Sequence, residues 1–138
     1  MEKCYTALAL AGRIFLAHIF LFSAAGKLAE PAGTQQYMAS FGMPATRFFL
    51  VAAIAFELVG GLSVLLGYRA RIGAIILLIF LIPTTIIFHT ELSVQLQMIM
   101  FMKNLTIMGG LFFVIAHGPG KLSLDTFVRC PITSKFCP

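Results

Sequence analysis

Four long apolar stretches dominate the sequence, at about residues 8–26, 48–67, 72–89 and 96–117. A helix that crosses a bilayer needs about 20 mostly apolar residues, and each stretch approaches or exceeds that length. Hydrophobic residues make up 59% of the 138-residue chain and charged residues 11%, against about 45–50% and about 25% in soluble domains. A small soluble core cannot bury so much apolar surface. We therefore predict an all-α integral membrane protein, an antiparallel four-helix bundle.

The rest of the chain is too short for a second domain, because four spans use roughly 80 residues. We assign residues 1–126 to one membrane domain and residues 127–138 to a cytoplasmic tail. In the first loop, residues 34–42 favour a short interfacial helix that ends at Gly42. Gly118-Pro119-Gly120 is expected to end the fourth span.

Positive charges are distributed unequally between the two sides of this topology. Four spans put both termini and the second loop on one side, which holds six cations: Lys3, Arg69, Arg71, Lys121, Arg129 and Lys135. The other side holds Lys27 and Arg47. Since cytoplasmic loops carry the excess of Lys and Arg, we predict that both termini are cytoplasmic. The net charge of +5 includes no run of five basic residues, so no nucleic-acid partner is indicated.

The cysteines Cys4, Cys130 and Cys137 lie near the termini. In the cytoplasm disulfides are rare, so we interpret all three as ordinary thiols. An inverted topology would make a Cys130–Cys137 disulfide plausible. Three dispersed histidines and no carboxylate cluster predict no metal or haem site.

Two ionisable residues, Glu57 and Lys103, lie well inside the predicted spans. Charges in a bilayer are costly, and they therefore face the bundle interior and pair. Lys103 belongs to the half of its span that is farther from the cytoplasm, so it can reach the depth of Glu57. We predict that the two pair, directly or through water, and that Asn104 and His18 complete a polar centre.

Arg13 and Lys27 lie on one face of the first span and flank this centre. They are separated by fourteen residues, about 21 Å along a helix. We expect each side chain to snorkel toward a different membrane interface.

A structural interpretation of the same residues stays open. A buried Glu–Lys pair can serve only to fix helix register. His18 can likewise be an ordinary core histidine with no functional role.

Motifs over residues 10–126 resemble the DoxX family. In chain order they are Arg13 and Lys27, Phe41-Gly42-Met43-Pro44, Glu57 with Gly60-Gly61, Gly67-Tyr68-Arg69-Ala70-Arg71, Lys103-Asn104-Leu105 with Gly109-Gly110, and Gly118-Pro119-Gly120-Lys121-Leu122-Ser123-Leu124-Asp125. The resemblance implies a four-helix protein of the bacterial inner membrane. It also implies that Arg13, Lys27, Glu57, Lys103 and Asn104 are the positions shared with the family.

The resemblance implies more than one function, because family members include the small membrane subunit of a thiosulfate:quinone oxidoreductase and membrane partners of redox enzymes. Our hypothesis is a small subunit of a redox-linked membrane assembly, accessory or facing a quinone. The sequence holds no nucleotide loop, haem ligand set or catalytic triad, so any redox chemistry would borrow a cofactor or a partner. The alternative is a non-catalytic scaffold or chaperone subunit. A transporter or channel is less favoured, since four spans form a pathway only as a homo-oligomer.

Overall fold

The structure, a computed structural model, describes residues 2–129 and confirms the all-α class. Its four long helices are α1 (Glu2–Ala29), α3 (Thr46–Leu66), α4 (Ala70–Phe88) and α5 (Gln95–His117). Each contains a segment that is long and apolar enough to cross a membrane. The last three begin and end within two residues of the predicted stretches, whereas α1 extends beyond its stretch at both ends. The predictions for Cys130 and Cys137 lie outside the described residues.

Two short helices complete the described chain. The first loop forms α2 (Pro31–Ser40), which begins on a proline and is followed by Gly42 in the left-handed conformation (φ 74°). A short helix in this loop is therefore confirmed, although it starts three residues before the predicted segment. The second, α6 (Leu124–Arg129), crosses the predicted boundary between the membrane domain and the tail.

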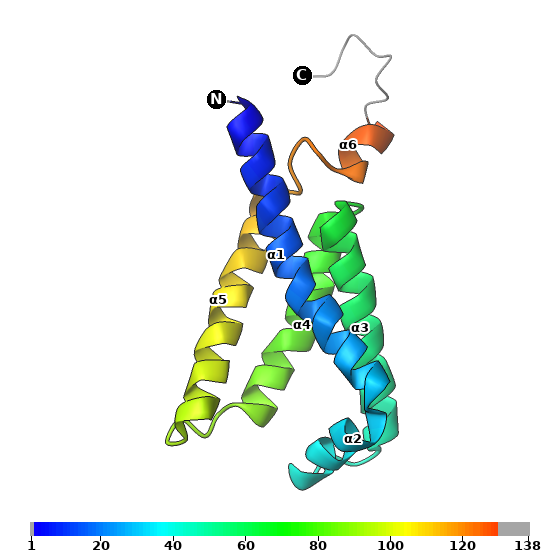
Figure 1. Cartoon of the computed structure of the whole chain (residues 1–138), viewed down its shortest axis with the longest axis vertical. Helices are drawn as coiled ribbons and strands as arrows, with labels where there is room; N and C mark the ends of the chain where they lie inside the picture. Colours follow the sequence, from blue (N-terminus) through cyan, green and yellow to red (C-terminus); the bar gives the residue numbers. More distant parts are fainter. Residues whose placement is uncertain (1, 130–138) are drawn as a thin grey trace.

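The long helices pack in the order α1, α3, α4, α5, with α1 also touching α5. Both ends of the described chain lie at one end of the bundle, and α2 and the α4–α5 loop lie at the other (Figure 1). Small residues bring α3 and α4 close together: a Cβ on Gly60 would come within 2.6 Å of the Leu77 side chain. Leu77, Val64 and Leu111 are the largest fully buried side chains among the described residues.

The segment after α5 closes the end of the bundle that carries the termini. The Asp125 carboxylate accepts the backbone N–H groups of Arg69 (2.8 Å) and Ala70 (3.3 Å), so it caps α4 from 55 residues away. Arg13 of α1 donates from Nη2 to the carbonyl of Leu122. Only 3% of the surface of Arg13 is exposed, so its guanidinium is held within the protein at this end of the bundle. The folded-back segment supplies its acceptor inside the protein.

Candidate functional site, a polar cavity between α1, α2, α3, α4 and α5

An ion pair between Lys27 and Glu57 joins α1 to α3. Lys27 donates from Nζ to both Glu57 carboxylate oxygens, at 2.9 and 3.0 Å, and to Ser23 Oγ at 2.6 Å. The Ser23 hydroxyl donates in turn to Glu57 Oε1 at 2.9 Å. Glu57 is 2% exposed, and within the protein the Lys27 ammonium supplies its counter-charge while Ser23 adds a hydrogen bond.

Helix geometry explains why Lys27 reaches Glu57. Ser23 and Lys27 are four residues apart and therefore lie one above the other on α1. Helical side chains lean toward the N-terminus of their own helix. A lysine in the last turn of α1 thus points back into the bundle, where antiparallel α3 places Glu57 near its middle.

The predicted direct contact between Glu57 and Lys103 is wrong. Lys103 is exposed, and its Nζ lies 3.2 Å from the sulfur of Met100. The reason is the order of the helices: α3 packs against α1 and α4, while α5 packs mainly against α4. Lys103 therefore faces Glu57 across a cavity and does not contact it.

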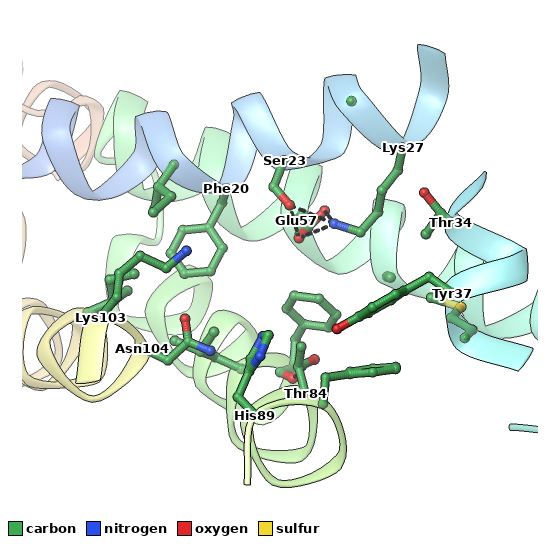
Figure 2. Close-up of a pocket in the computed structure, with 18 residues that line it drawn as sticks. Phe20, Ser23, Lys27, Thr34, Tyr37, Glu57, Thr84, His89, Lys103 and Asn104 are labelled. Carbon is green, nitrogen blue, oxygen red and sulfur yellow. Dashed lines mark hydrogen bonds and ion pairs between the residues drawn. The ribbon is translucent and has the colours of Figure 1, made fainter. Parts of the chain in front are cut away.

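That cavity has a volume of about 400 Å³ and is partly open to the outside. Both Glu57 and Lys103 line it, together with the aromatic rings of Phe20, Phe80 and Phe88. Figure 2 shows the polar side chains of α1, α2, α3, α4 and α5 around this space. Its volume falls in the range of about 300–1,000 Å³ that is usual for small-molecule sites. Its lining combines apolar and aromatic side chains with a comparable set of polar ones.

Two hydrogen-bond donors in the cavity are free for a ligand. Tyr37 of α2 points its hydroxyl into the space (Figure 2), and this hydroxyl bonds to none of the other described residues. Lys103 forms no ion pair within residues 2–129, and a thioether is a weak acceptor. Its ammonium is therefore available as well.

Two further polar residues of the cavity are held in position by neighbours. Asn104 is buried and donates from Nδ2 to the Thr85 hydroxyl at 3.0 Å. At the end of α4, the Nδ1 atom of His89 lies 2.7 Å from the Oε1 atom of Gln97. Because an amide oxygen only accepts, Nδ1 carries the hydrogen of that bond. The other ring nitrogen, Nε2, is left for a ligand.

Two of the predicted site residues lie elsewhere. His18 is exposed and stacks on Phe22, with 5.9 Å between the ring centroids. It follows Ala17, which is fully buried, and it lies about 140° around α1 from Ser23. His18 therefore does not belong to the polar centre. Arg13 lies at the other end of the bundle, in the contact with Leu122.

Sequence reasoning missed Ser23, Tyr37 and His89. The spacing of Ser23 and Lys27 on one helical face was a readable signal for a shared partner. Tyr37 and His89 carried no such signal, because they lie in a short helix and at a helix end whose positions depend on tertiary packing.

The cavity can bind a small head group that carries oxygen atoms. The ammonium of Lys103 and the hydroxyl of Tyr37 can donate to such atoms, and the aromatic walls can contact a planar ring. Within residues 2–129, no three side chains of the metal-binding types come together. The arrangement suits binding and orientation of a ligand.

Comparisons with known proteins agree with this architecture. The DoxX family model matches residues 8–90. The chain is 38% identical to inner membrane protein YqjF of Escherichia coli (strain K12) over 129 residues, which cover 94% of this chain and 98% of YqjF. It is 32% identical to inner membrane protein YphA of the same organism over 123 residues, which cover 86% of this chain and 88% of YphA. No solved structure matches the chain significantly. The family match over more than half of the chain and the nearly full-length match to YqjF show that this protein belongs to the DoxX family of inner membrane proteins.

Proposed function

We propose that the protein binds the head group of a membrane-soluble quinone in the polar cavity, as a small subunit of a redox-linked assembly in the inner membrane. The observation that carries the proposal is the pair of free donors, Lys103 Nζ and the Tyr37 hydroxyl, in a cavity with aromatic walls. A quinone presents carbonyl oxygens on a planar ring, which suits donors of this kind.

The residues of the cavity divide into two groups under this proposal. Lys103, Tyr37 and His89 contact the head group, and the rings of Phe20 and Phe88 enclose it. Lys27 and Ser23 hold the Glu57 carboxylate in place, and Thr85 holds Asn104. A bound quinone would supply the capacity to accept and release electrons together with protons.

A partner protein belongs to the proposal because the cavity residues provide no electron donor of their own. Such a partner would deliver or remove electrons at the membrane. The excess of cations at the end that carries the termini supports placing both termini in the cytoplasm.

Quinone binding is tested with the purified protein in detergent and a short-chain ubiquinone analogue. We expect the analogue to raise the melting temperature of the wild type, since a ligand that binds only the folded state stabilises it. Lys103→Met and Tyr37→Phe should each reduce this shift. Arg47→Met, at an exposed position outside the cavity, should retain it. A wild-type protein with an unchanged melting temperature over the soluble range of the analogue would contradict the proposal.

The assembly is tested by purification from native membranes followed by mass spectrometry and a visible spectrum. Co-purification of a redox protein supports the redox-linked subunit. In the scaffold alternative, Lys103→Met would alter the yield of the complex but leave its redox turnover per complex unchanged.

A further inference from the structure

A second hollow, about 320 Å³ in volume, lies between α3 and α4 and shares no lining residue with the polar cavity. Its walls are apolar side chains of both helices: Val59, Leu62, Leu66, Ile72 and Ile76. Ser63 and Gly73 also line it, and their small size brings the helices close together, because a Cβ on Gly73 would be 2.5 Å from the Ser63 Cβ. The hollow is therefore a groove along a tight helix crossing.

One end of the groove is formed by the turn between the two helices, with Tyr68 and Arg69. Ser63 donates from its hydroxyl to the Tyr68 carbonyl at 2.6 Å, and Asp125 accepts the backbone N–H of Arg69. Arg69 has a left-handed backbone (φ 47°), which is unusual for a residue with a side chain. The turn therefore holds an arginine in a backbone conformation that glycine or asparagine adopts more easily.

The guanidinium of Arg69 is available for an anion. It lies 5.9 Å from the centre of the Tyr68 ring. It forms no ion pair with any carboxylate in the described part of the chain, since the nearby Asp125 carboxylate accepts backbone amides instead. Because α3 ends at Leu66 and α4 begins at Ala70, Arg69 lies where both spans leave the membrane.

We propose that this groove binds an anionic phospholipid. The phosphate accepts hydrogen bonds from the Arg69 guanidinium, whose planar fork matches phosphate oxygens. The upper part of one acyl chain lies in the groove, which runs about 10 Å along α3 from Leu66 to Val59. Within residues 2–129 the charge of Arg69 is unpaired, and it favours a lipid with a net negative head group.

Native mass spectrometry of the full chain in detergent tests the proposal, because it counts the lipids that each molecule retains. The protein is mixed with equal amounts of phosphatidylglycerol and phosphatidylcholine that have identical acyl chains. We expect the wild type to retain about five times more phosphatidylglycerol than phosphatidylcholine, because one basic residue near the membrane surface favours an anionic lipid by about this factor. Arg69→Gln should bring the ratio close to one, and Arg69→Lys should retain part of the preference.

Two matched controls separate a specific site from general attraction. Arg47→Gln removes a cation at the start of α3, the other end of that helix, and should leave the ratio unchanged. Ile72→Trp fills the groove and should lower lipid retention. Ile79→Trp, at a similarly exposed position of α4 outside the groove, should not lower it. A wild-type preference that survives Arg69→Gln, or equal retention by the two tryptophan variants, would overturn the proposal.

Discussion

At the scale of single residues, the buried contact of Lys27 with Glu57 determines which substitutions the bundle tolerates. Glu57→Gln leaves the Lys27 ammonium without a counter-charge, and we expect a loss of about 3 kcal/mol in the free energy of unfolding. That figure is at the low end for buried pairs because the Lys27 side chain keeps 18% exposure. Unfolding in mixed detergent micelles, followed by circular dichroism, measures the loss.

Two further variants identify the partner of Glu57. Lys27→Met combined with Glu57→Met should recover most of the lost stability, since apolar residues of similar volume often replace a buried pair without cost. Lys103→Met should change the free energy of unfolding by less than about 0.5 kcal/mol, as expected for an exposed side chain. If Lys103→Met destabilises as much as Lys27→Met, our assignment of the pair is wrong.

Two glycines with similar backbones differ in what surrounds them. Gly67 (φ 68°) lies against Arg13 and Ser123, and a Cβ there would be 2.5 Å from the Ser123 Cβ. Gly42 (φ 74°) has nothing within 4 Å of that position. We expect Gly42→Ala to lower the free energy of unfolding by about 1 kcal/mol through backbone strain alone. Gly67→Ala should lower it by about 3 kcal/mol, because overpacking adds to the same strain. Thermal unfolding of both variants checks this difference, and equal losses would contradict it.

The sequence was sufficient to select Glu57, Lys103 and Asn104 as cavity residues, but not to pair them. Helical spacing shows which side of its own helix a residue occupies, so Glu57 and Lys103 could both be placed toward the interior. Spacing does not show which helix lies next to which. Lys27 could be identified as the partner of Glu57 only once α1 was placed beside α3.

At the scale of elements, the α3–α4 turn depends on a side chain from far along the chain. Asp125→Ala removes the acceptor for the Arg69 and Ala70 amides, and the loss of a cap costs about 1 kcal/mol. We expect hydrogen exchange of these two amides to become about fivefold faster. Glu91→Ala, in the loop at the opposite end, is the control and should leave both rates unchanged. Unchanged rates in Asp125→Ala would refute this capping role.

The elements differ in how far the sequence could predict them. Apolar stretches of about 20 residues specify spanning helices almost alone, so α3, α4 and α5 agree with prediction within two residues. By contrast, α6 lies where no apolar stretch marks a span, and its docking through Asp125 depends on the distant α3–α4 turn.

At the scale of the whole molecule, the positive charges predict the orientation in the membrane. A variant with Cys4 as its sole cysteine should resist a membrane-impermeant maleimide added to intact spheroplasts, because Cys4 is exposed at the end we place in the cytoplasm. Thr90→Cys, exposed in the α4–α5 loop and made without the other cysteines, should react. The reverse labelling pattern would show the opposite topology.

The contact of Arg13 with Leu122 spans 109 residues and therefore has a consequence for biogenesis. The first helix leaves the ribosome long before its carbonyl partner has been synthesised. Until then its guanidinium must be solvated by lipid head groups or water, because a bare cation in hydrocarbon is costly. The first helix thus reaches its final place only after the last segment has been translated. Insertion of this protein ends when the segment that contains Leu122 closes against the first helix.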